Sequence, residues 1–336
     1  MYKIIDMHCD TIPALYERKK QRMSVSLQKN DLHIDIEKLR QGNYLCQCFS
    51  LFTYLDAVKA EGITPFSHVQ SLAEFWLEQI GMYPDTFRQV KSYQDILDAD
   101  AEGKIGAIMT AEEGAVYEGK IENLHTLYDM GVRISTLTWN FINELGYPNP
   151  APVQGQPWMP DEEQGLTETG IEFVQEMERL GILVDISHLN DAGIRDVFTY
   201  VKGPVIATHS NARAECYHLR NLSDDMIRGI AEHGGVTGIN FCPGFLREQG
   251  EGIVGENRVA STKDMVRHMK YLKNLGGIDC ISLGTDFDGI TGELDLKNAG
   301  EMQYLADVMS LEGFTSEEIE KVFSKNILRV FRETWK

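Results

Sequence analysis

The sequence predicts an α/β protein with the (β/α)8 architecture of a TIM barrel. Short apolar or β-branched runs alternate with longer amphipathic stretches, which is the pattern of repeated βα units around a parallel sheet. Eight such runs can be distinguished. Several of them end in side chains that can bind metal ions, and the strand ends of one barrel all open onto the same rim.

The predicted strands are short segments rich in Val, Ile, Leu and Thr. They lie near residues 3–8, 44–52, 105–111, 133–138, 183–186, 205–208, 236–240 and 280–284. Eight strands separated by helical stretches are the number that a closed (β/α)8 barrel requires.

The predicted helices have apolar residues at helical spacing, and several begin at a Ser, Thr, Asp or Asn cap. Six lie between strands, at residues 67–82, 121–130, 168–180, 191–200, 224–233 and 263–275. Three more, at 302–311, 316–324 and 326–335, are expected to cover the barrel from outside.

Two segments are predicted to be loop insertions. Residues 146–165 contain five prolines, too many for a regular helix, and follow the fourth strand, where a loop can shape the substrate mouth. Residues 244–259 are Gly-rich and acidic and follow the seventh strand on the same face. Because the chain has no fixed-length repeat or linker, residues 1–336 are predicted to form a single barrel domain.

Composition excludes several functional classes. The chain has 336 residues, of which 43% are hydrophobic, and this is enough for one large core. A net charge of −19 argues against nucleic acid and anionic membranes as partners, because both are bound by basic surfaces. The six cysteines include no CxxC pair, so a disulfide framework is not expected.

The sequence also bears on location. The N-terminal residues run directly into the first proposed metal ligands, without the charged start and apolar stretch of a signal peptide. No run approaches the roughly 18 apolar residues of a membrane helix. We therefore expect a cytoplasmic enzyme with a small-molecule substrate.

Four strand ends place potential metal ligands in the order His-x-Asp, Glu, His, His. The residues are His8 and Asp10, Glu113, His188 and His209. Imidazole nitrogen and carboxylate oxygen suit zinc and similar divalent cations. The pattern therefore predicts a metal-dependent hydrolase.

Longer motifs extend this pattern along nearly the whole chain. They are DMHCD, HIDIEKLRQGN, AEEG, VRISTLTWN, LTETGIEFVQEMERLGILVDISH, GPVIATHSNA, RNLSDDMI, GINF, GTDFDG and NILRVF. In these motifs the chain resembles the renal (membrane) dipeptidase family, metallopeptidase family M19, of the amidohydrolase-like superfamily. Members of that family often pair as dimers, so a homodimer is an open expectation.

The resemblance implies two Zn²⁺ ions, with other divalent ions left open. His8 and Asp10 would hold one ion, and His188 and His209 the other. Glu113 would bridge them, because a carboxylate can offer one oxygen to each cation. Glu112 is its neighbour, and successive strand residues face opposite sides. The family places the ligand immediately before a glycine, which selects Glu113.

The implied chemistry is hydrolysis by a hydroxide shared between the ions. Two cations about 3.5–4 Å apart lower the pKa of a shared water towards roughly 7, and one of them polarises the scissile carbonyl. Asp286 would transfer a proton to the departing amine. Asp288 is the alternative for that transfer, or it holds a loop through hydrogen bonds.

The resemblance also implies substrate contacts. Arg220 matches the arginine that binds the free carboxylate, through two parallel hydrogen bonds. Trp139 stands where vertebrate members have a histidine, and an indole cannot change charge near neutral pH. Asn140 or Asn143 is a candidate for the missing polar contact.

The implied function is a dipeptidase that cleaves short peptides and tolerates a D-residue on the C-terminal side. One alternative is another hydrolase at the same site, acting on an N-acyl amino acid, a lactone or a β-lactam, because fold does not fix function. A remoter alternative is a non-catalytic metal-binding barrel. The other histidines are expected to be surface or hydrogen-bonded residues: His33, His68, His125, His218, His233 and His268.

Overall fold

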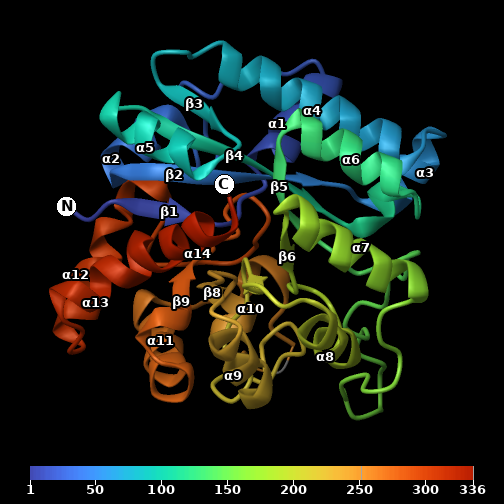
Figure 1. Ribbon diagram of the computed structural model, residues 1–336. Coiled ribbons are helices and arrows are strands. Elements are labelled where there is room, and N and C mark those ends of the chain that lie inside the picture. The colour runs from blue at the N-terminus through green and yellow to red at the C-terminus, as the bar shows by residue number, and fades with distance from the viewer. Residues whose placement is uncertain (251, 336) are drawn as a thin grey trace.

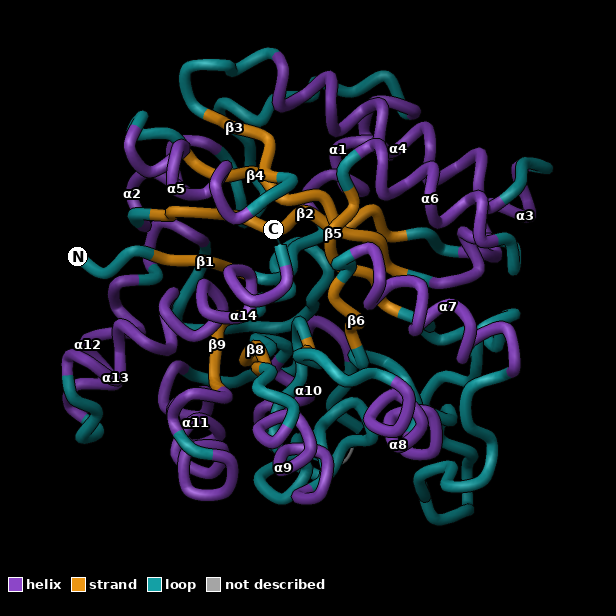
Figure 2. The backbone as a smooth tube through the Cα atoms, viewed as in Figure 1, coloured by secondary structure: helices purple, strands orange, loops and turns teal. Residues whose placement is uncertain are grey.

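A computed structural model describes residues 1–250 and 252–335 and confirms the (β/α)8 barrel. The parallel strands run in the order β2-β1-β9-β8-β7-β6-β5-β4, and pairing of β2 with β4 closes the ring (Figures 1 and 2). The barrel strands are β1 (Ile4–Asp6), β2 (Tyr44–Phe52), β4 (Ile105–Glu112), β5 (Val132–Thr136), β6 (Leu183–Asp185), β7 (Ile206–Ala207), β8 (Val236–Ile239) and β9 (Ile281–Leu283).

A further strand, β3 (Phe87–Val90), was not among the predicted strands. It pairs with the first half of β4, from Ile105 to Ile108, while β5 pairs with β4 from Met109 onward. It therefore extends the sheet beside β4 without entering the ring (Figure 2). Its two central residues are polar and half-buried, so its short sequence gives little strand signal.

Helices surround the ring (Figure 1). They are α1 (Thr11–Lys20), α2 (Ile36–Gly42), α3 (Leu55–Glu61), α4 (Pro65–Gly81), α5 (Tyr93–Ala101), α6 (Ile121–Met130), α7 (Glu168–Leu180), α8 (Asp191–Tyr200), α9 (Asp224–Glu232), α10 (Pro243–Leu246), α11 (Thr262–Gly276), α12 (Gln303–Leu311), α13 (Ser316–Glu320) and α14 (Asn326–Thr334). Predicted caps form where expected: Thr167 accepts a hydrogen bond from the amide of Gly170, and Asn190 from that of Gly193. A π-helical segment, Lys321–Lys325, joins α13 to α14.

The two predicted insertions differ in structure. Residues 146–165 contain no helix or strand, as their prolines predict, and make one isolated bridge between Pro148 and Leu189. The segment 244–259 begins inside α10 and contains a short 3-10 turn at Gly255–Asn257. Residue 251 of this segment lies outside the described residues. Within the described ranges, no helix combines the length and apolar character needed to span a bilayer.

The apolar core consists of two clusters, one outside the barrel and one inside it. A large cluster fills the space between strands and helices, and a smaller cluster fills the barrel near the strand beginnings, with Leu183, Ile206 and Val236. Phe331 of α14 and Trp335 pack on this smaller cluster, with ring centroids 3.9 Å apart. Apolar packing thus closes the end of the barrel where the strands begin, so polar groups gather at the opposite rim.

Close packing at Gly284, directly after β9, gives a test of this geometry. A Cβ there would stand 1.7 Å from the Thr208 carbonyl oxygen, and Thr208 precedes His209. We expect Gly284→Ala to lower the free energy of unfolding by about 1–3 kcal/mol through overpacking, as measured by urea denaturation.

Gly81, at the end of α4, is the matched control, because a Cβ there meets nothing within 4 Å. Gly81→Ala should be neutral or stabilise the fold, since alanine favours helix over glycine. Equal effects of the two substitutions would contradict the close approach at Gly284.

Candidate active site

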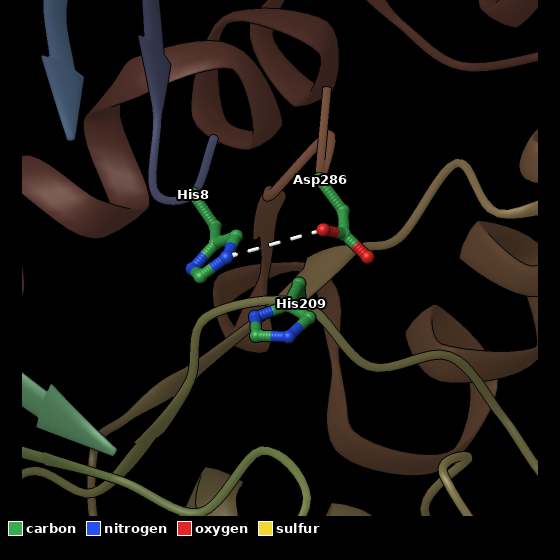
Figure 3. Close-up of side chains that lie close together, drawn as sticks. All are labelled: His8, His209 and Asp286. Atoms are coloured by element: carbon green, nitrogen blue, oxygen red, sulfur yellow. Dashed lines mark ion pairs between the residues drawn. The ribbon is translucent and has the colours of Figure 1, made fainter. Parts of the chain in front are cut away.

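Five polar side chains from distant parts of the chain meet at the carboxyl rim of the barrel. His8 follows β1, Glu112 ends β4, His188 follows β6, His209 follows β7, and Asp286 follows β9. The three histidines and Glu112 are buried, and the Asp286 side chain is 14% exposed. Figure 3 shows His8, His209 and Asp286 converging on one space.

The Glu112 carboxylate lies at the centre of this group. Its Oε2 is 3.3 Å from His8 Nε2, while its Oε1 is 3.2 Å from His188 Nε2 and 3.7 Å from His209 Nε2. Asp10 Oδ1 lies 3.7 Å from His8 Nε2. Three sets of ligand atoms result: His8 with Asp10 and Glu112, His188 with His209 and Glu112, and His8 with His209 and Asp286. The first two sets share only Glu112.

The expectation that Glu113 faces the histidines is therefore wrong. Its carboxylate turns away and accepts hydrogen bonds from the amides of Ala115 (2.9 Å) and Trp139 (2.8 Å) and from Asn143 Nδ2. Strand alternation explains the error, because only one of two successive residues can face the barrel interior. Glu113 has a φ of 87°, so it leaves the strand in a conformation typical of glycine.

The alternation along β4 in the structure identifies Glu112 as the residue that faces the site. Ile108 belongs to the interior cluster and Met109 to the outer one, so every second residue from Ile108, through Thr110 to Glu112, faces the barrel interior. The glutamate-before-glycine pattern selects the wrong neighbour because this chain has a glutamate, Glu113, at the turn position.

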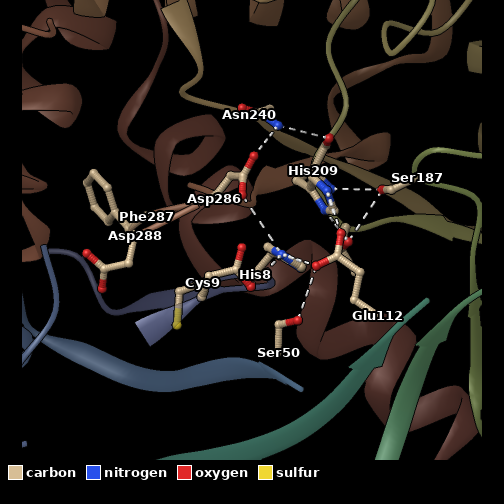
Figure 4. A network of polar contacts seen from close by, with 12 residues as sticks. His8, Cys9, Ser50, Glu112, Ser187, His209, Asn240, Asp286, Phe287 and Asp288 are labelled. Carbon is tan, nitrogen blue, oxygen red and sulfur yellow. Dashed lines mark hydrogen bonds and ion pairs between the residues drawn. The ribbon is translucent and has the colours of Figure 1, made fainter. Parts of the chain in front are cut away.

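Asp10 and Asp286 approach each other across Gly289. A Cβ on Gly289 would stand 2.2 Å from Asp10 Oδ2 and 2.7 Å from Asp286 Oδ1, so only glycine leaves room for both carboxylates. Asn240 Nδ2 donates to Asp286 Oδ2 at 2.9 Å, and Asp286 Oδ1 lies 3.9 Å from His8 Nε2 (Figure 4). One oxygen of Asp286 is thus anchored and the other faces the shared space.

Asp288 is committed elsewhere. Its carboxylate accepts hydrogen bonds from Thr11 Oγ1 (2.6 Å) and from the His33 amide (2.7 Å), and it contacts His33 Nδ1 at 2.8 Å. In Figure 4 this carboxylate points away from Glu112. Of the two functions considered for Asp288, the contacts match the holding of a loop.

Two buried aspartates that the sequence analysis did not single out support the histidine-bearing segments. Asp6, on β1, accepts hydrogen bonds from the His8 amide (3.3 Å), the Thr285 amide (2.8 Å) and Thr285 Oγ1 (2.7 Å). Because Thr285 follows β9, these bonds fix the segment carrying His8 beside the segment carrying Asp286. Its position two residues before a histidine was the available signal.

Asp185, at the end of β6, has the same function for the second pair of histidines. It accepts hydrogen bonds from the amides of Ser187 and Thr208, each at 2.9 Å, and from the Thr208 hydroxyl. Thr208 Oγ1 also lies 2.7 Å from His209 Nδ1. Because that hydroxyl donates to Asp185, it accepts from Nδ1–H of His209, which leaves the lone pair on Nε2 directed at the site.

Burial and the charges of neighbouring side chains shift the pKa values of the residues in this site. Burial alone would lower the pKa of His8, but Glu112, Asp10 and Asp286 outweigh it and raise that pKa to about 10. Burial raises the pKa of Asp10 well above its usual range, and the Glu112 charge adds to this. Burial, with the Arg220 charge, lowers the pKa of His188 to about 4.

The donor set fits bound cations. Three carboxylates converge with three histidines in a buried space, and His8 Nε2 and Asp10 Oδ1 have no hydrogen-bond partner among the described residues. Buried polar atoms of this kind are normally paired or coordinate metals. His8, Asp10, Glu112, His188 and His209 are therefore the residues that could hold metal ions, and Asp286 lies beside two of them, His8 and His209.

A cavity of about 990 Å³ opens onto these groups. Arg220, 6% exposed, lines it and donates from Nη1 to Ser210 Oγ and from Nη2 to the His209 carbonyl, both at 3.2 Å, while its Nε has no partner among the described residues. Trp139 and Asn140 also line the cavity, and Asn140 Oδ1 lies 3.2 Å from His188 Nδ1.

Asn143 is not at the cavity wall, because it holds Glu113 and the Leu137 carbonyl. Most of the histidines expected to be structural have a polar partner: His33 with Asp288, His125 with Glu176, His233 with the Gly229 carbonyl and His268 with the Leu246 carbonyl. His218 accepts a hydrogen bond from the Arg220 amide and also lines the cavity.

The adjacent glutamates provide a matched pair of variants. We expect Glu112→Gln to lose most of its bound divalent metal, because a neutral amide cannot serve both ligand sets. Glu113→Gln should keep it. Metal content per chain by mass spectrometry, with circular dichroism to confirm folding, measures this. Metal loss in the Glu113 variant with retention in the Glu112 variant would contradict the assignment.

Comparison with known proteins places the chain in a family. The model for "Membrane dipeptidase (Peptidase family M19)" matches residues 1–336. An uncharacterised dipeptidase of Schizosaccharomyces pombe is 30% identical over 350 aligned residues, which cover 99% of this chain and 80% of that protein.

Two solved structures are similar over 99% of each chain, each with a TM-score of 0.88 and 25% identity. One is described as the dipeptidase AC, a metallopeptidase of family M19; the other is a metallopeptidase from Rhodobacter sphaeroides with a phosphinate mimic of the dipeptide L-Ala-D-Ala. The whole-length match and the convergent ligand set make this chain a member of the membrane dipeptidase family, peptidase family M19, and thus a metal-dependent dipeptidase.

Proposed function

We propose that this dipeptidase uses two zinc ions to hydrolyse short peptides and accepts a D-residue at their C-terminal position. The observation that carries the proposal is the position of Glu112, whose two oxygens face two different sets of ligands. A single ion would not need both sets. Imidazole and carboxylate donors favour zinc, although other divalent ions satisfy the same donors.

When bound, such ions make water more acidic and polarise a carbonyl group. The remaining tasks fall to the protein's own side chains. Asp286 is our candidate for the proton transfer to the departing amine, because one of its oxygens is anchored by Asn240 and the other faces the cavity. The bond that it accepts from Asn240 fixes the orientation of its carboxylate.

Arg220 is our candidate for the free carboxylate of the substrate. Its buried guanidinium has neutral partners, Ser210 and the His209 carbonyl, and no carboxylate pairs with it in the described part of the chain. Buried charges are normally paired, so a substrate carboxylate would complete the site. Arg220 donates to the carbonyl of His209, a proposed metal ligand, so a peptide whose C-terminus binds Arg220 can place only a short C-terminal part beyond the metal site.

Trp139 and Asn140 are proposed to form the opposite wall. The Trp139 ring packs edge-on against Phe52, with centroids 5.0 Å apart, and against Tyr54 at 5.7 Å. This aromatic wall suits an apolar part of the substrate. Asn140 contacts the back of His188, so it can also fix that imidazole.

Two further parts of the proposal concern the stereochemistry of the substrate and the compartment of the enzyme. The Rhodobacter sphaeroides structure holds a mimic of L-Ala-D-Ala, which supports acceptance of a D-residue here. All six cysteines are buried and unpaired, which supports a reducing compartment such as the cytoplasm.

A substrate panel tests the proposal. Chelation should abolish hydrolysis of L-Ala-D-Ala and L-Ala-L-Ala, and two equivalents of zinc per chain should restore it. N-acetyl-alanine carries the same free carboxylate and tests the related hydrolase activity. Faster turnover of N-acetyl-alanine than of any dipeptide would contradict the proposal, and bound zinc without any hydrolysis would favour a non-catalytic barrel.

The proton-transfer role has its own test. Asp286→Asn should lower kcat by about 10²–10⁴-fold with metal content retained, because general acid–base groups contribute on that scale. Asp288→Asn is the matched control and should cost much less turnover, since that carboxylate holds Thr11 and His33. A near-normal rate in the Asp286 variant would remove it from the mechanism.

A further inference from the structure

Two arginines flank neighbouring residues of one turn at the cavity wall. The Arg220 guanidinium lies 5.6 Å from the ring centroid of Phe245 in α10. The guanidinium of Arg258 covers Gly244, where an added Cβ would stand 2.9 Å from Arg258 Nη1 and 3.2 Å from its Cζ. Both arginines line the cavity. Because Gly244 and Phe245 are consecutive residues of α10, the two arginines contact the same turn of the cavity wall.

The backbone around Arg258 is held in place from both sides. Its carbonyl accepts a hydrogen bond from the Glu293 amide at 2.8 Å, next to the isolated bridge between Val259 and Glu293. The side chain of Gln249 accepts from the Val259 amide at 3.1 Å and donates to its carbonyl at 3.2 Å. The position of Arg258 at the wall is thus built into the loop.

Among the described residues, the two arginines at this wall have no ion-pair partner, in contrast to Arg213. Arg213, which lies nearby, is neutralised by Asp191 through bonds of 2.7 and 2.8 Å. Neither Arg220 nor Arg258 has a carboxylate partner in the ranges that the structure describes. Five carboxylates of the described residues line the same cavity, at Asp10, Glu112, Asp161, Asp286 and Asp288, but none of them forms an ion pair with either arginine, so both guanidinium groups can pair with a carboxylate of the ligand.

His218 and Cys242 are titratable side chains that feel the charge of both arginines, and both are neutral. His218 Nδ1 accepts a hydrogen bond from the Arg220 amide at 3.1 Å, and its ring lies between Trp158 and Phe245. Burial, together with the charge of Arg220, lowers the pKa of His218 to about 3. Burial raises the pKa of the Cys242 thiol to about 11. Arg258 is therefore the arginine of the cavity lining that remains, besides Arg220, to pair with an anionic group.

We propose that Arg258 selects an acidic residue, Asp or Glu, at the C-terminal position of the dipeptide. This inference rests on the proposed function, in which Arg220 holds the main-chain carboxylate. The side chain of that residue branches from the carbon next to this carboxylate, so it begins close to Arg220. A side-chain carboxylate reaching Arg258 forms a second charge-assisted pair, and an uncharged side chain leaves Arg258 without a partner.

The test compares substrates of equal shape and different charge. With the zinc-loaded enzyme, kcat/KM is measured for Ala-Asp against Ala-Asn and for Ala-Glu against Ala-Gln, with both stereoisomers at the second position. We expect the acidic member to be favoured by about tenfold or more, mainly through a lower KM, and the preference to shrink as salt is added.

The variants then assign the preference to a residue. Arg258→Gln should bring the ratio of acidic to neutral substrate close to one, and Arg258→Lys should keep part of it, because a lysine retains charge without the planar fork. Arg247→Gln is the matched control: Arg247 lies exposed on the same segment and outside the cavity lining, and its variant should keep the wild-type ratio.

Hydrolysis of Ala-Asn with no preference for Ala-Asp, or an equal loss of preference in the Arg258→Gln and Arg247→Gln variants, overturns the inference and leaves the dipeptidase proposal standing. Hydrolysis of no dipeptide at all overturns the proposed function and the inference with it.

Discussion

The burial of one carboxylate, that of Glu112, among three imidazoles constrains the rest of the rim. Burial opposes the ionised form of Glu112, but the neighbouring His8 and His188 outweigh it and hold its pKa well below the usual range. A buried charge of this kind persists only with opposite charge at hand. The three histidines, Glu112, Asp10, Asp286 and the cations that they fit therefore form one electrostatic unit. This unit forms only when the strands close into a ring.

That unit is supported by a second layer and by backbone strain. Asp6 and Asp185 tie neighbouring strand ends together, which fixes the backbone of the segments that carry the histidines, and Thr208 Oγ1 holds the His209 ring. Glu113, His188 and Asp286 adopt φ values of 87°, 70° and 60°. Non-glycine residues in this region are strained, and such strain clusters at functional sites. The apolar base of the barrel provides the stability that offsets it.

Much of the fold could be predicted from the sequence, because the strand and helix periods differ and the caps are clear. The helix bounds at Ile121–Met130, Glu168–Leu180 and Asp191–Tyr200 agree with the predicted ones. Strand β3 could not be predicted, because it lies at the edge of the sheet and lacks an apolar run. Its recognition requires knowledge of its partner β4.

The candidate site was predictable to the extent that each ligand lay in its own short motif. The choice between Glu112 and Glu113 requires knowing which residues of β4 point into the barrel. That is a property of the closed barrel and not of the local sequence. The functions of Asp6 and Asp185 likewise depend on contacts between separate strands. Arg258 lies on a loop with no recognisable sequence motif, and only the folded chain brings it to the cavity that Arg220 lines.

The most direct measurement of the central claim is anomalous diffraction at the zinc edge from zinc-loaded crystals. Glu112 as the shared ligand predicts two anomalous peaks, one beside each of its oxygens, with His8 and Asp10 at one and His188 and His209 at the other. A single peak, or a peak contacted by Glu113 in place of Glu112, would contradict it.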